Sequence, residues 1–128
     1  MVRIASITLK ENNMRVNEIL KEANLRCPNS FDPDMQFKLI CDFESRLIYE
    51  FTGEELDISF PDCGDFELML PRRYSDIYVL YLAAMYCFWN REYEEYNNHL
   101  ALFGSLLSQY REERKSGGKE RKRFFNLF

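Results

Sequence analysis

The chain has 128 residues, of which 46% are hydrophobic and 16% aromatic, enough side chain for a single domain with its own core. With 30% charged residues and no apolar run near the roughly 20 residues of a membrane span, the composition argues against a transmembrane protein. The formal net charge of −4 is uneven, because residues 115–128 carry five basic residues and one Glu, which leaves 12 basic and 20 acidic residues, a charge of −8, in residues 1–114.

The first 26 residues predict one short helix after a segment that is either a strand or loose. Apolar residues alternate imperfectly in residues 1–13, and no signal peptide is expected there. In "NNMRVNEILKEANLRC", Asn12 or Asn13 is the expected helix cap. The apolar stripe of this helix consists of Val16, Ile19, Leu20 and Ala23, and Pro28 ends it.

A second helix is predicted from about residue 33 to 50. Asp32 can cap it, and Pro33 suits the first helical position because its missing N–H would have no partner there. Gly53 marks its end. One broad face holds Phe37, Ile40, Cys41, Glu44, Leu47, Ile48 and Phe51.

Residues 56–70 have the period of β-strands. Apolar residues alternate in 56–60 and again in 66–70, with the turn sequence "PDCGD" between them. This pattern predicts a β-hairpin in which Asp62 and Asp65 bond local backbone. Because an isolated hairpin is only marginally stable, it must pack on the helices or on another chain.

Two longer helices follow. The third, "YSDIYVLYLAAMYCFWN", has Ser75 as its expected cap and is apolar on nearly all sides, which indicates a central position. Its main stripe, expected to be buried, is Ile77, Leu80, Tyr81, Ala84, Met85 and Phe88. "NRE" predicts a break. The fourth helix carries a heptad-like seam of Tyr93, Tyr96, Leu100, Phe103, Leu107 and Tyr110, and "KSGGK" is expected to end it.

These elements predict a mainly α fold: a small bundle of about four helices with a short β-hairpin between the second and third. A single domain is expected over residues 1–114, of which 1–13 are either a strand or loose, followed by a flexible basic and aromatic tail at 115–128.

Catalytic chemistry is not expected. His99 is the sole histidine and is read as a surface or capping residue. Cys27, Cys41, Cys63 and Cys87 lie 14, 22 and 24 residues apart, unlike the close pairs of metal sites, so no metal site is predicted. A disulfide is not predicted either, because the chain is expected to be cytosolic and to have a full core, and the cysteines are interpreted as small half-buried thiols. No phosphate-binding or dinucleotide-binding glycine motif is present.

The tail allows three interpretations: a solvated basic segment, a nucleic-acid contact, or a docking peptide. Its candidate contact residues are Arg121, Lys122, Arg123, Phe124, Phe125, Leu127 and Phe128. Basic residues mixed with aromatic ones can grip phosphates and stack on bases, although the chain as a whole is acidic. The docking interpretation is preferred because an exposed apolar terminus favours a partner that covers it.

The stretch "YSDIYVLYLAAM", followed by "NREYEEYNNHLALF", resembles the C-terminal part of the head–tail connector (adaptor or head-completion) proteins of long-tailed bacteriophages and prophages. "RVNEILKEANLR" and "FKLICDFESRLIYEF" fit the order of elements in that family, and the resemblance covers roughly residues 14–112.

The resemblance implies a structural subunit of the virion head–tail junction, assembled in the host cytoplasm, with no reaction, no cofactor and no membrane. It implies a ring of about twelve copies on the portal protein that extends the DNA channel and receives a downstream tail or head-completion protein. DNA would pass through without sequence-specific binding, past an acidic wall that repels it. Tyr78, Trp89 and Tyr93, which lie off the main apolar stripe, are the candidate subunit-interface residues; burial within the chain is the alternative for each. The competing function is a small helical DNA-associated or regulatory protein that uses its basic tail.

Overall fold

The computed structural model describes residues 13–55 and 65–127, and the side chains of 13–55 and 65–116. Within these ranges the chain forms helices α2 (Val16–Arg26), α3 (Pro33–Thr52), α4 (Asp76–Trp89) and α5 (Tyr93–Leu127). The same ranges also contain two short strands and one 3-10 turn: β1 (Asn13–Arg15), β2 (Glu67–Pro71) and η1 (Arg72–Tyr74). The predicted class, a mainly α bundle of four helices with a short two-stranded antiparallel sheet, is confirmed.

Helix α3 begins and ends at the signals predicted for it. The Asp32 carboxylate accepts the N–H of Asp34 at 3.0 Å, and Pro33 is the first helical residue. At the other end Gly53 has φ 77°, a left-handed conformation that costs glycine little, and its N–H donates to the Tyr49 carbonyl. These signals lie within a few residues of each end, so local sequence is enough to predict the bounds of α3.

Helix α2 is capped by a residue far away in sequence. Asn13 belongs to β1 rather than to a cap, and its amide donates to the Leu68 carbonyl at 2.9 Å. The Asp65 carboxylate accepts the N–H of Asn17 at 3.0 Å and pairs with the Arg15 guanidinium at 3.1 Å. The expectation that Asp65 bonds only local backbone is therefore wrong; a carboxylate near a helix N-terminus is favoured by the helix dipole.

The sheet joins the two ends of the α2–α3 segment. β1 and β2 are antiparallel, with Asn13 opposite Pro71 and Arg15 opposite Glu67, and the register is irregular between them. The second predicted run forms β2 between α3 and α4 and buries Leu68 and Leu70. The first predicted run, 56–60, lies outside the described residues. In the described part of the chain, the strand that pairs with β2 is β1, which precedes α2.

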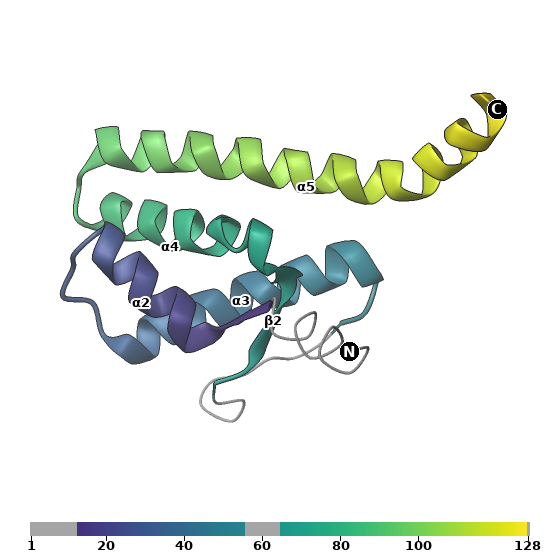
Figure 1. Cartoon of the computed structure of the whole chain (residues 1–128). Helices are drawn as coiled ribbons and strands as arrows, with labels where there is room; N and C mark the ends of the chain where they lie inside the picture. The colour runs from purple at the N-terminus through teal and green to yellow at the C-terminus, as the bar shows by residue number, and fades with distance from the viewer. Residues whose placement is uncertain (1–12, 56–64, 128) are drawn as a thin grey trace, which may run out of the picture.

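Helix α4 is the central element. Figure 1 shows α5 along one side of α4 and the α2–α3 pair along the other, and contacts between these elements agree. Its buried residues point in every direction, as its sequence predicted: Ile77, Tyr78, Val79, Leu80, Leu82, Ala83, Ala84, Tyr86 and Cys87. Ser75 precedes the helix but makes no side-chain cap; the η1 turn leads into α4 instead.

The seam of α5 becomes more buried along the helix. Tyr93 is exposed, Tyr96 and Phe103 are partly buried, and Leu107 and Tyr110 are in the core. Arg111 forms a two-pronged ion pair with Glu50 of α3, at 2.6 and 2.9 Å, which holds this half of α5 in place.

The end of α5 differs from the sequence expectation. The backbone stays helical through 117 and 118 as far as Leu127, so "KSGGK" does not end the helix. Glycine in a helix costs about 1 kcal/mol relative to alanine, a penalty that lowers helix stability without forbidding the helix. Figure 1 shows the last turns bending away from the line of the preceding ones.

Candidate functional site

The three predicted interface residues have different positions. Tyr78 is completely buried in the core, so it cannot contact another chain, and its assignment as an interface residue is wrong. Trp89 and Tyr93 are 37% and 54% exposed. The tail residues Arg121–Phe128 lie beyond the described side chains, although the backbone to Leu127 is helical.

Trp89 and Tyr93 belong to an exposed group of rings at the α4–α5 turn, which we call the turn aromatic cluster. It has two parts: Phe88 with Tyr93 and Tyr96, and Trp89 with Phe31. The Phe88 ring lies 5.8 Å from Tyr93 and 5.1 Å from Tyr96, and Trp89 meets Phe31 edge-on at 5.3 Å. Phe88 was expected to be core but is 45% exposed, because it lies in the last turn of α4.

The turn that carries this cluster is tightly built. Arg91 has φ 62°, a left-handed conformation unusual for a residue with a side chain. Its N–H donates to the Phe88 carbonyl at 3.1 Å, and the N–H of Glu92 donates to the Cys87 carbonyl at 2.8 Å. The break predicted at "NRE" is therefore present, and it holds the first residues of α5 beside the last turn of α4.

A shallow groove runs between α2, α4 and α5. Its volume is about 280 Å³, and Leu102, which is 59% exposed, forms part of its wall. Arg26 and Asp76, 4.0 Å apart, lie at its polar side. The groove lining contains no histidine or cysteine.

Tyr78 instead takes part in a buried polar network. Its hydroxyl donates to Glu44 Oε1 at 2.6 Å and accepts the N–H of Leu70 at 3.1 Å. Glu44 Oε2 accepts the N–H of Met69 at 2.6 Å. Burial raises the pKa of the Glu44 carboxyl, while the bonds from Tyr78 and Met69 partly oppose that rise. In the sequence, the position of Glu44 on the apolar face of α3 was the feature that could have indicated this network.

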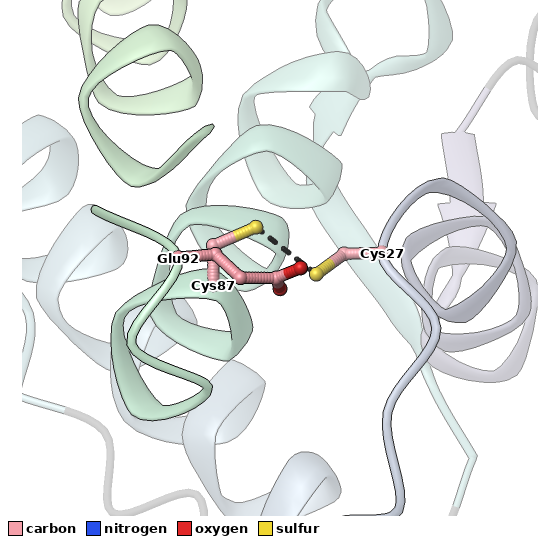
Figure 2. A group of neighbouring side chains, drawn as sticks. All are labelled: Cys27, Cys87 and Glu92. Atoms are coloured by element: carbon pink, nitrogen blue, oxygen red, sulfur yellow. Dashed lines mark hydrogen bonds between the residues drawn. The ribbon is translucent and has the colours of Figure 1, made fainter. Parts of the chain in front are cut away.

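A second cluster of side chains brings Cys27 together with Cys87 and Glu92, which come from a distant part of the sequence. The Sγ atoms of Cys27, at the end of α2, and Cys87, in the last turn of α4, are 3.0 Å apart, and both residues are buried. The Glu92 carboxylate lies beside them, and the ligand atoms of all three residues are within 4.8 Å of one another (Figure 2). Sequence spacing had not predicted this group, since Cys27 and Cys87 are 60 residues apart.

His99 lies at the edge of this group. Its Nδ1 atom is 2.7 Å from the Glu95 carbonyl oxygen and 3.9 Å from Cys87 Sγ. Burial raises the pKa of the Cys87 thiol to about 12, and the hydrogen bond and charge of Cys27 and the charges of Glu92 and Glu95 add to the rise. In the absence of a cation, Cys87 is therefore a neutral thiol at physiological pH.

Comparisons with protein families, with curated proteins and with solved structures find no match to this chain. Among the described helices, none combines the length and the apolar character that crossing a membrane requires.

Proposed function

We propose that this chain is a structural subunit of a phage or prophage head–tail connector, which docks as a ring on the portal vertex, extends the DNA channel and supports tail attachment, with no catalytic activity of its own. The proposal starts from the resemblance of residues 14–112 to that family. The order of the four helices is compatible with it.

The observation that carries the proposal is the turn aromatic cluster. Phe88 and Trp89 are the last two residues of α4, and Tyr93 is the first residue of α5. Each of the three side chains is more than a third exposed, and the rings of Phe88 and Tyr93 are in contact. Aromatic residues are enriched in protein interfaces because they combine large contact area with a polar tip. A head-to-tail ring needs two different complementary faces, and the cluster supplies a candidate for one of them.

Charge supports the same function. Residues 1–114 have a net charge of −8, so a wall built from them would repel the phosphates of passing DNA. The basic and aromatic residues Arg121–Phe128 are the candidate contact with the portal or with a neighbouring copy, and residues 121–127 of this segment belong to the last turns of α5.

The test is co-sedimentation of the full-length chain with portal-bearing heads or purified portal. Tyr93→Ser and Trp89→Ser should reduce association, while Tyr49→Ser, which removes an aromatic ring of similar exposure (57%) from α3, should not. A fourth variant, in which Arg121, Lys122 and Arg123 become Glu, tests the tail. Failure of the unmodified chain to associate with any portal-bearing particle would contradict the proposal.

A DNA-associated or regulatory protein is the second candidate, and the excess of basic residues in 115–128 favours it. This function predicts DNA binding whose affinity falls steeply with salt, and its loss in the Arg121/Lys122/Arg123→Glu variant. Filter binding at two salt concentrations separates the two candidates, because the connector function predicts weak DNA binding that does not depend on the tail.

A further inference from the structure

We propose that Cys27, Cys87 and Glu92 form a binding site for a zinc-class divalent cation that joins the end of α2 to the α4–α5 turn. The site does not depend on the connector function. It uses the buried thiol groups of Cys27 and Cys87 and the exposed carboxylate of Glu92, whose Oε2 also accepts a 3.4 Å hydrogen bond from the Asn90 side-chain amide.

The three ligand atoms already converge. Figure 2 shows the side chains of Cys27 and Cys87 facing each other from separate segments, with the Glu92 carboxylate reaching the same point. In a tetrahedral site with Zn–S bonds of about 2.3 Å, two sulfurs are about 3.8 Å apart. The sulfurs here are 3.0 Å apart, so binding requires them to separate by only about 0.8 Å.

The backbone positions each ligand. The N–H of Cys27 donates to the Ala23 carbonyl at 2.9 Å at the end of α2. The 2.8 Å bond from the Glu92 N–H to the Cys87 carbonyl fixes the other two ligands relative to each other. Cys27 and Cys87 are buried while Glu92 is exposed, so the carboxylate side gives an ion access from solvent.

The donor set selects the cation. Two thiolates favour a soft or borderline ion such as Zn²⁺ over Mg²⁺ or Ca²⁺, which prefer all-oxygen sites. On binding, each thiol loses its proton to solvent and forms one sulfur–metal bond, and the carboxylate provides the third ligand. His99 Nδ1 faces the Glu95 carbonyl, so His99 is not counted as a ligand, and a water molecule fills the fourth position.

A disulfide is the competing use of the two sulfurs. It would require them to approach to about 2.05 Å, a movement of about 1 Å in the opposite direction, and an oxidant to accept two electrons and two protons. It would make no use of the carboxylate at Glu92. The carboxylate is the reason for preferring the metal.

The experiment is titration of the full-length, phosphine-reduced chain with Co²⁺, read by thiolate-to-cobalt charge-transfer absorption, followed by displacement with Zn²⁺. We expect one ion per chain and loss of the absorption in Cys27→Ser and Cys87→Ser. In Glu92→Gln, which removes a direct ligand, we expect affinity lowered by at least the roughly 10- to 100-fold that is typical of losing an outer-shell partner. Cys41→Ala and Cys63→Ser are the cysteine controls and should bind as the unmodified chain does. Because Glu92 is exposed, Glu92→Gln should fold normally, which circular dichroism checks.

The proposal is overturned if the reduced chain gives no charge-transfer absorption, if the absorption survives in both Cys27→Ser and Cys87→Ser, or if Glu92→Gln binds with unchanged affinity. It is also overturned if the reduced chain binds no metal while mild oxidation by a small-molecule disulfide joins Cys27 to Cys87, since the pair would then be a redox site.

Discussion

The hydroxyl of Tyr78 donates a 2.6 Å hydrogen bond to the carboxylate of Glu44, and both residues are fully enclosed in the protein. Through the backbone N–H groups of Met69 and Leu70, the same pair also holds β2. One buried carboxylate and one phenol thus connect α3, α4 and the sheet. This explains why a glutamate occurs on the apolar face of α3, where an aliphatic residue would otherwise be expected.

Tyr78→Phe should destabilise the fold. The substitution keeps the ring but removes the hydroxyl, which leaves Glu44 Oε1 and the N–H of Leu70 without their partner. An unsatisfied buried polar group costs about 1–3 kcal/mol, so the free energy of unfolding should fall by about that amount. Urea denaturation followed by circular dichroism measures it, and a variant as stable as the unmodified chain would contradict the role of this network.

Tyr86→Phe is the matched comparison, on the same helix and equally buried, and should have the opposite effect. The Tyr86 hydroxyl has no partner among the described residues, so its removal takes away a desolvation cost without breaking a bond. The variant should be unchanged or about 1 kcal/mol more stable. A loss of stability similar to that of Tyr78→Phe would mean that the Tyr86 hydroxyl has an acceptor in the folded protein.

Glu44 should produce a pH dependence of stability opposite to that of most carboxylates. Its pKa is raised in the folded state above the ordinary value of 4.5, chiefly by burial. The folded state then binds the proton more tightly than the unfolded state, so this contribution is complete below pH 4.5 and is lost as the pH rises through the folded-state pKa.

Glu44→Gln removes this titration. The stability advantage of the unmodified chain over the variant should therefore decrease as the pH rises above 4.5, because other carboxylates, such as Glu50, whose pKa is lowered by Arg111, occur in both proteins and cancel. Thermal or urea unfolding across a pH series measures the difference. Parallel stability curves for the two proteins would show that the Glu44 pKa is not raised.

Asp65→Ala should weaken the start of α2. The substitution removes the acceptor for the Asn17 N–H and the partner of Arg15, at a cost of about 1 kcal/mol, typical of a lost N-cap. Asp65→Asn keeps an oxygen acceptor and loses only the charge of a partly exposed ion pair, which contributes little, so its loss should be smaller. Equal losses in the two variants would indicate that the ion pair, rather than the cap, is the important contact.

Several elements follow from neighbouring residues alone. Asp32, Pro33 and Gly53 predict the bounds of α3 because caps, proline and left-handed glycine act within one or two turns. The apolar residues on all sides of residues 76–89 predict a central helix, since such a surface is stable only when covered on every side. The seam of α5 follows from its spacing in the same way.

Only the tertiary structure decided the polar contacts and the partner of β2. Asp65 caps a helix 48 residues earlier, Glu44 meets Tyr78 across 34 residues, and Cys27 meets Cys87 across 60. Caps and periodicity depend on residues a few positions apart, so the sequence by itself determined the bounds of α3 and the central position of α4, but not the cap of α2 or the end of α5. It carries no comparable signal for which polar side chains meet when the helices pack, because that depends on how distant helices are placed against one another in the fold.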